Sequence, residues 1–257
     1  MLAVVPAAAS ADPASCPPDP VDHGEVVAVI DADLIALGDG RIIRLAGLHV
    51  AKPDRPGAVA AETDLNAAAR AYVREAVEGR TVGIAATMDE PDRYGRVVTH
   101  VMPDHTEAVR WLQGGLVAAG LARVDSQVDK WGCGALLLER EETARQRGLG
   151  LWATRLGTIF RADRPDELTG EIGRFAIVEG KVVSVGERPR RTYLNFGTYW
   201  NEDFTAYVDR RHRAGFERSG LALGALAGQH VRVRGFVIDD RGPAIRMTGP
   251  GQLERVD

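Results

Sequence analysis

The sequence predicts an α+β part followed by a β part, each with a core of its own. Between residues 23 and 160, runs with the alternation of strands are interleaved with runs that have the spacing of helices, whereas strand-like runs dominate from residue 173 onward. The intervening residues 161–172 contain Pro165, Gly170 and several charges, which are typical of a linker. Because 257 residues suffice for two domains, we expect a domain of five strands and three helices at 23–160, a linker at 161–172 and a second, smaller domain of strands at 173–257.

The first part is expected to alternate strands and helices. Strands are predicted at 26–30, 34–37, 41–45, 81–87 and 97–102, and helices at 62–78, 106–120 and 135–148. In the first of these helices Leu65, Val73 and Val77 fall on one face, and Gly79 ends it. A glycine-containing turn at 38–40 indicates a hairpin between the second and third strands.

The second part is expected to be mainly strands. They are predicted at 177–185, 192–197, 204–208, 230–238 and 244–247, with a short helix at 213–227 before the fourth. The phrases at 179–185, 228–235 and 242–247 resemble the first, fourth and fifth strands of barrels that bind oligonucleotides or oligosaccharides (OB folds). We therefore expect this part to be OB-like.

The N-terminal residues 1–22 are expected to be the remnant of a signal peptide followed by a linker. Ala9-Ser10-Ala11 follows a short apolar run and has the form of a cleavage site, although a charged n-region is missing. We therefore expect an exported protein, periplasmic or secreted; the alternative is a cytoplasmic protein with an Ala/Pro-rich tail. In an exported protein Cys16 and Cys133 could pair, and two unrelated thiols are the alternative.

The charge is distributed unevenly along the chain. Residues 1–169 hold 18 Lys and Arg against 25 Asp and Glu, whereas residues 170–257 hold 14 against 11, for a total of −4. An acidic first part is unfavourable for a polyanion, which is held mainly by neutralising its phosphates. No run approaches the roughly 20 apolar residues of a membrane helix.

Five segments of the first part fall in the order seen in one known family. They are Val29-Ile30-Asp31-Ala32-Asp33-Leu34, Arg44-Leu45-Ala46-Gly47-Leu48-His49-Val50-Ala51-Lys52, Asp92-Arg93-Tyr94-Gly95-Arg96, Leu116-Val117-Ala118-Ala119-Gly120-Leu121-Ala122-Arg123-Val124 and Ala144-Arg145-Gln146-Arg147-Gly148-Leu149-Gly150-Leu151-Trp152. Over about residues 23–155 the chain resembles the thermonuclease (staphylococcal nuclease-like) family. The resemblance implies an OB-type five-stranded barrel with three helices.

The resemblance also implies a metal-dependent phosphodiesterase site, of which this chain keeps a part. Asp33 matches the first metal-binding aspartate of the family and Asp31 the aspartate that precedes it. Arg44 and Arg96 match the two arginines that clamp the phosphate, a role that stabilises charge developing on phosphorus. The alternative for Asp33, Arg44 and Arg96 is a structural ion-pair network.

Two positions of the family site are substituted. His49 stands where the second metal carboxylate is expected, and Lys52 stands where the glutamate base is expected. Imidazole is a poor calcium ligand, and an ammonium group cannot take a proton from water. Two rescues are open: Asp54 or Glu62 could reach into the site, or Asp33 and His49 could hold a transition metal. Otherwise His49 is an ordinary surface or satisfied histidine.

The second part contains an aromatic cluster flanked by arginines. Tyr193, Tyr199, Trp200, Arg190 and Arg191 are the candidate binding residues, because stacking aromatics beside cations hold single strands. The alternative is that the aromatics fill the core, with Tyr193 and Phe204 pointing inward.

We expect a non-catalytic binding or accessory protein with a degraded nuclease site. The partner is a protein or a nucleic acid, with a protein somewhat favoured by the acidic first part and the expected export. The alternative is an active metal-dependent nuclease with a rearranged site. No cofactor is expected; the alternative is Ca²⁺ or another divalent metal at Asp33. An ion pair from Lys52 to Asp31 or Asp33 would favour the non-catalytic protein.

Overall fold

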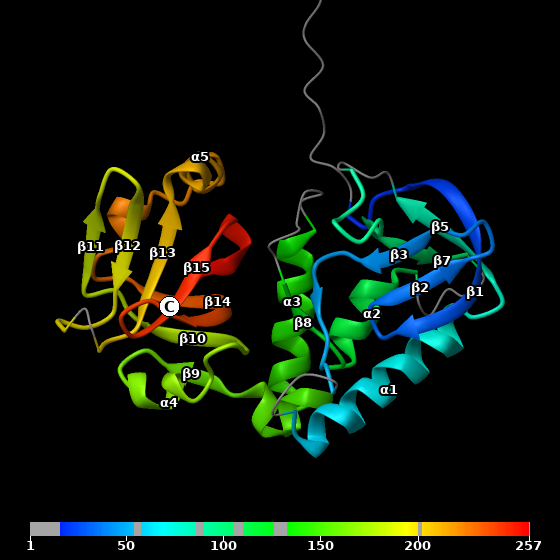
Figure 1. The fold of residues 1–257 in the computed structure, drawn as a ribbon, viewed down its shortest axis with the longest axis horizontal. Helices are drawn as coiled ribbons and strands as arrows, with labels where there is room; N and C mark the ends of the chain where they lie inside the picture. Colours follow the sequence, from blue (N-terminus) through cyan, green and yellow to red (C-terminus); the bar gives the residue numbers. More distant parts are fainter. Residues whose placement is uncertain are drawn as a thin grey trace, which may run out of the picture.

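The chain folds into two lobes (Figure 1), as seen in a computed structural model that describes residues 16–53, 58–85, 90–104, 110–125, 133–199 and 202–256. Helix α3 (Gly134–Gln146) lies between the lobes (Figure 1). Each lobe has its own cluster of buried apolar side chains. Within the described residues no helix is long and apolar enough to cross a membrane.

The first lobe is built on a six-stranded sheet with the order β6-β3-β2-β1-β5-β7. Its strands are β1 (Pro20–Asp31), β2 (Leu34–Leu37), β3 (Ile42–Leu45), β5 (Thr81–Ala85), β6 (Val97–Thr99) and β7 (Val101–Pro103). The long strand β1 pairs with β5 through its first half and with β2 through its second half. Only His100 separates β6 from β7 in the sequence. The two strands at opposite ends of this order are therefore consecutive parts of one bent segment.

These strands match most of the expectation for the first part, with two corrections. Strand β1 begins at Pro20 and pairs with β5, so residues 20–22 are not part of a linker. The single strand predicted at 97–102 is two, because the chain turns at the buried His100. The predicted cleavage site at 9–11 lies outside the described residues.

The helices of the first lobe are α1 (Ala60–Val77), α2 (Leu112–Ala118) and α3. Helix α2 starts later than the helix predicted at 106–120, and residues 105–109 lie outside the described part. The backbone segments that follow α2 and α3 lie against each other, and Leu151 N donates to Gly120 O at 2.9 Å. A Cβ at Gly120 would lie 2.2 Å from Leu149 O, so both the contact and its positive φ require glycine.

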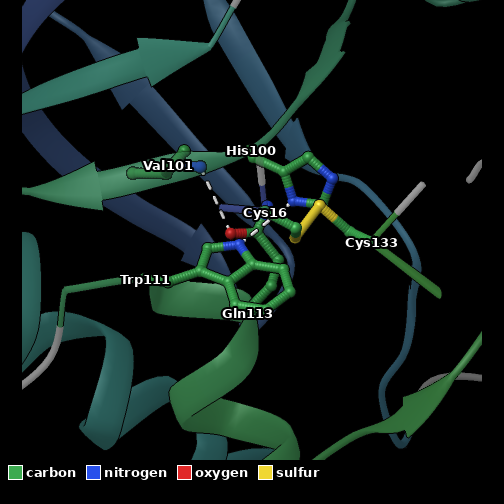
Figure 2. Close-up of a disulfide and its surroundings, with 6 residues drawn as sticks. All are labelled: Cys16, His100, Val101, Trp111, Gln113 and Cys133. Atoms are coloured by element: carbon green, nitrogen blue, oxygen red, sulfur yellow. Dashed lines mark hydrogen bonds between the residues drawn. A yellow bond between two sulfur atoms is a disulfide. The ribbon is translucent and has the colours of Figure 1, made fainter. Parts of the chain in front are cut away.

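A disulfide between Cys16 and Cys133 ties the start of the described chain to the N-terminus of α3. Figure 2 shows the two sulfur atoms beside the imidazole of His100. His100 is buried, and its Nδ1 accepts a hydrogen bond from Trp111 Nε1 at 3.1 Å. Burial lowers the pKa of His100 to about 4. The imidazole is therefore neutral at pH 7, as the bond from Trp111 requires.

The second lobe is built on an eight-stranded sheet with the order β11-β12-β13-β15-β14-β10-β9 and β16 beside β14. Its strands are β9 (Ile159–Arg161), β10 (Phe175–Lys181), β11 (Ser184–Glu187), β12 (Arg191–Asn195), β13 (Thr205–Asp209), β14 (His230–Asp239), β15 (Pro243–Met247) and β16 (Leu253–Arg255). The strand predicted at 177–185 is two strands, β10 and β11. The path through the described strands is open, so the expected second barrel is not confirmed.

Residues 161–172 do not form the predicted linker. Strand β9 pairs in parallel with β10, and helix α4 (Pro165–Thr169) follows it. Ala162 and Leu168 are buried in the second core, which gives this segment a structural role. The helix predicted at 213–227 is likewise two elements, α5 (Arg210–Arg218) and a 3-10 turn η4 (Leu223–Leu226).

A buried arginine connects the two lobes. Arg234 of β14 donates to Glu141 Oε2 on α3 at 2.6 Å, to Val124 O at 3.2 Å and to the carboxylate of Glu254. Its side chain is 1% exposed and that of Glu141 is 5% exposed. Burial would lower the pKa of Arg234, but the two carboxylates outweigh it and raise the pKa. The lobes are thus joined by a fully desolvated ion pair.

Candidate functional site

A groove of about 1140 Å³ runs between the lobes and contains the expected site of the first part. The first lobe contributes Asp33, Arg44, Leu48, His49, Val50, Lys52, Val59, Ala60, Ala61, Glu62 and Arg123, and the rest of the chain Arg155, Leu156, Thr158, Phe160, Glu167, Glu171, Arg174, Phe175 and Phe236. The lining therefore combines apolar side chains with charges of both signs.

Lys52 bridges the two aspartates at the end of β1. Its Nζ lies 2.6 Å from Asp31 Oδ2 and 2.6 Å from Asp33 Oδ1. The side chain of Asp33 is 6% exposed, so its charge is compensated by the ammonium group at close range. A single cation between two carboxylates is the arrangement that a metal ion would otherwise supply.

Asn66 of α1 holds this bridge in place. Its Nδ2 donates to Asp31 Oδ1 at 2.9 Å and to Ala51 O at 2.8 Å, so it fixes both the aspartate and the backbone that carries Lys52. Burial by itself would raise the pKa of Asp31, but the bonds from Lys52 and Asn66 outweigh it and lower the pKa. Asp31 is therefore a carboxylate at neutral pH, fully engaged within the protein.

The two retained arginines are not equivalent. Arg44 lines the groove, with its Nε 3.9 Å from Asp33 Oδ2 and its side chain 35% exposed. Arg96 is not among the lining residues; it donates to Asp92 Oδ2 at 2.8 Å and lies over the Tyr94 ring. Despite burial, the bonds from Arg96 and from the backbone of the turn hold the pKa of Asp92 at about 2. The structure thus brings only Arg44 to Asp33.

His49 lies against aromatic side chains of the second lobe. Its ring stacks on Phe175 with centroids 4.5 Å apart and meets Phe236 edge-on at 5.5 Å. The short strand β4 (Leu48–His49) positions it through pairing with β8 (Arg123–Val124). His49 is therefore an interlobe contact residue, packed against Phe175 and Phe236 of the second lobe.

The residues present do not fit a divalent cation at Asp33. The Lys52 ammonium lies between the carboxylates that would have to bind the metal, and the described residues contain no group of three or more His, Cys, Asp or Glu that could hold one. Glu62 lines the groove, but its Oε2 accepts from Val59 N at the start of α1 at 2.9 Å. Asp54, the other expected rescue, lies outside the described residues.

Comparison with known families supports the first lobe's resemblance. Residues 42–154 match the family model described as Staphylococcal nuclease homologue. The first lobe therefore contains a region similar to staphylococcal nuclease, which we call the SNase domain. The match begins after Asp31 and Asp33 and spans less than half of the chain, so the second lobe lies outside it. No curated protein matches the chain. The expected resemblance to thermonucleases, and with it an OB-type fold of mixed strands and helices, is confirmed for this region.

The aromatic candidates of the second lobe, outside the SNase domain, divide between its core and its surface. Phe204 is buried in the core, as the core alternative predicts, whereas Tyr193 does not point fully inward and lines a second groove. Arg191 lies 4.2 Å above the ring of Tyr207 and lines the same groove. Arg190 is exposed and Tyr199 is 67% exposed; Trp200 lies outside the described residues.

Several residues at the groove between the lobes, which we call the SNase groove, were not predicted from the sequence. Asn66 is an amide on the inward face of α1, and that polar residue on an apolar face was a usable signal. Phe175 and Phe236 come from the second lobe, and no local pattern places them at His49. Arg123 lies over Phe175 and donates to Phe175 O at 3.1 Å, and burial lowers its pKa to about 10.

Proposed function

We propose that the SNase domain of this chain is catalytically silent and that the chain is a binding or accessory protein. The observation that carries the proposal is the Lys52 bridge, in which one ammonium group lies 2.6 Å from both Asp31 and Asp33. The bridge supplies internally the positive charge that a bound metal would bring to these carboxylates.

This arrangement lacks both the metal ion and the general base that phosphodiester hydrolysis requires. A metal ion would have to displace a lysine from two short ion pairs, and breaking such a pair leaves a buried carboxylate uncompensated. Lys52 stands at the position where the family has its base, and a protonated amine engaged with two carboxylates cannot activate water. Removal of a general base alone typically costs about 10²–10⁴-fold in rate.

The groove between the lobes supports a protein segment as the partner. It offers an aromatic shelf whose exposed part is the ring of Phe236, which is 44% exposed and is backed by His49 and the buried Phe175. Charged groups of both signs border the shelf, which suits a segment with apolar anchors and polar flanks.

We also propose that the second lobe is an OB-like barrel, because β10 pairs with β14 and β14 with β15 as expected for its first, fourth and fifth strands.

Export to an oxidising compartment is part of the same proposal. The Cys16–Cys133 disulfide supports it, since such bonds persist in secreted and periplasmic proteins and are rare in the reducing cytosol. Reduced and oxidised protein can be distinguished by alkylation of a periplasmic extract and of a cytosolic extract. Free thiols in the native protein would contradict this part of the proposal.

The second candidate function is a nuclease with a rearranged site. One observation favours it: Asp33 and Arg44 remain adjacent in an open groove. The assay that decides is cleavage of labelled single-stranded DNA and RNA with Ca²⁺, Mn²⁺ and Zn²⁺ in turn. We expect no cleavage by the natural protein. Metal-dependent cleavage that the Arg44→Ala variant abolishes would establish the nuclease and overturn the silent site.

Substitution of Lys52 tests the bridge directly. Lys52→Glu places a third carboxylate beside Asp31 and Asp33, and we expect the variant to bind Ca²⁺ in isothermal titration calorimetry where the natural protein does not. Lys181→Glu is the matched control, because Lys181 is exposed in the second lobe and the change in charge is the same. Equal Ca²⁺ binding by the natural protein and the Lys52 variant would contradict the role given to the ammonium group.

A further inference from the structure

The structure gathers basic side chains at one edge of the second lobe. The turn between β11 and β12 carries Arg188 and Arg190, and the first turns of α5 carry Arg210, Arg211 and Arg213. Arg210 N donates to Arg190 O at 2.8 Å, and the Arg213 guanidinium donates to Arg188 O, so the two segments are in direct contact. We call these five residues the arginine cluster.

The arginine cluster is not neutralised within the part of the chain that the structure describes. None of its members forms an ion pair there, and Arg188, Arg190, Arg210 and Arg211 are exposed. Like charges at this spacing repel one another, although water and salt reduce the effect. Such a cluster is favourable for binding an anion with several charges, and guanidinium groups match phosphate in geometry.

A groove of about 840 Å³ on the outer face of the sheet adjoins the cluster, and Arg188 belongs to both. The groove is lined by Val183, Ser184, Gly186, Arg188, Arg191, Tyr193, Asn195, Gly197, Thr198, Thr205, Tyr207, Asp240, Arg241 and Ala244. Hydroxyl and amide groups of Ser184, Tyr193, Asn195, Thr198, Thr205 and Tyr207 line part of its walls. They offer donors and acceptors of the kind that nucleobase edges bind.

Two tyrosines from adjacent strands form part of the groove. Tyr193 of β12 and Tyr207 of β13 are directly opposite in register, with ring centroids 6.0 Å apart. Arg191 covers Tyr207 and is anchored by Asp209 at 3.2 Å and by Asp240 at 2.7 Å. Tyr207 is thereby buried, whereas Tyr193 is half-buried and keeps part of its surface open to the groove.

We propose that the arginine cluster and this groove together bind single-stranded nucleic acid, with phosphates at the arginines and an unstacked base against Tyr193. A single strand fits because its bases are free to reach the floor of a sheet, which bases within a duplex are not. The site lies in the second lobe and does not use the Lys52 bridge. The inference therefore goes beyond the proposed function, and the failure of one leaves the other standing.

Fluorescence anisotropy of the full chain with a labelled 20-nucleotide single strand, DNA and RNA in turn, tests the proposal. The variant Arg190→Gln/Arg210→Gln/Arg211→Gln removes three exposed cations from the cluster. We expect affinity to fall on the order of 100-fold at about 50 mM salt, and the dependence of log affinity on log salt to become shallower by about 2. Arg161→Gln/Arg164→Gln/Arg255→Gln removes three exposed cations elsewhere in the same part of the chain and should retain the natural affinity.

Stacking is tested separately, with Tyr193→Leu. We expect affinity to fall about tenfold with an unchanged salt dependence, because a stacking contact carries no counterion release. Absence of binding by the natural protein would overturn the proposal, as would equal weakening by the two triple variants. Tighter binding to phosphatidylglycerol vesicles, to duplex DNA or to an acidic protein than to the single strand would also overturn it. Circular dichroism checks that each variant is folded.

Discussion

The basic side chains of the two lobes differ in whether carboxylates neutralise them. In the first lobe, Lys52 lies 2.6 Å from both Asp31 and Asp33, and Arg96 is held by Asp92. In the second lobe the arginine cluster has no ion pair within the described residues, although Arg191 nearby has two. The arginine cluster is therefore available to a polyanion, whereas Lys52 and Arg96 are already engaged by carboxylates of the first lobe.

This difference shows that a count of basic residues does not locate a binding surface. Residues 170–257 exceed neutrality by only three charges, yet the five residues of the arginine cluster lie together on one turn and one helix end. The SNase domain retains Arg44 and Arg96, but its own carboxylates hold them. Charge available to a partner depends on pairing in three dimensions.

The largest expected effect is the loss of unfolding free energy in the first lobe, but not in the second, when the disulfide is removed. Both cysteines of the chain are in the first part, 117 residues apart, and their disulfide encloses most of that lobe. In the chain-entropy account, a loop of this length contributes about 5 kcal/mol. We expect Cys16→Ser/Cys133→Ser to lower the unfolding free energy of the first lobe by a large part of this amount, measured by urea denaturation with the emission of the buried Trp111 as the probe.

The reduced natural protein provides a second test of whether the disulfide stabilises the first lobe selectively. Dithiothreitol should reproduce the effect of the double variant, because both leave the loop open. The second lobe, which contains no cysteine, should keep its transition at nearly the same urea concentration. A loss below about 1 kcal/mol, or equal losses in both lobes, would show that the disulfide does not distinguish them.

The next effect concerns the connection of the lobes. Arg234→Met leaves Glu141 buried without its partner, and we expect a loss of about 3–5 kcal/mol in unfolding free energy. Arg161→Met is the control, because Arg161 is exposed and its pair with Asp163 is at the surface; its effect should stay within about 0.5 kcal/mol. If both variants unfold alike, the interlobe pair does not stabilise the structure.

The smallest of the three effects depends on pH and is confined to the first lobe. The pKa of His100 lies at about 4 in the folded protein against an ordinary 6.5, so the unfolded chain binds the proton first as pH falls. Stability is therefore expected to decrease between pH 6.5 and pH 4, by about 3 kcal/mol, and to be unaffected by this group above pH 6.5.

His100→Asn tests this pH dependence, with the exposed His230→Asn as its control. Urea denaturation at pH 7 and at pH 4.5 should show a smaller loss of stability for His100→Asn than for the natural protein. The control should behave like the natural protein. Identical pH profiles for the natural protein and His100→Asn would rule out a depressed pKa at this position.

Local patterns in the sequence predict most of the fold. The strand at 34–37 is predicted to the residue, and β5, β12, β13, β14 and β15 to within two residues at most ends, because alternation and turn residues are local signals. The segment 161–172 is not a linker, because the proline and charges that predict one also occur in a short helix such as α4. Its burial depends on Ala162 and Leu168 meeting a core built from distant strands.

The candidate site was predictable only where residue identity matters more than position in space. The motif positions identified Asp31, Asp33, Arg44 and Lys52, and the structure brings them together. The position of Arg96 away from the groove and that of His49 against Phe175 depend on tertiary packing. Contacts between lobes leave no periodicity in the sequence, so such roles follow only from the tertiary structure.

The stack of His49 on Phe175 bears on what a carboxylate metal site at this groove would require. An aspartate at position 49 would set a carboxylate against an aromatic ring of the other lobe, in a contact that now has centroids 4.5 Å apart. Such a site would thus require coordinated substitutions at Lys52 and His49 in the first lobe and at Phe175 in the second. Since none of these changes completes the site by itself, the interlobe contact makes its acquisition in single steps unfavourable.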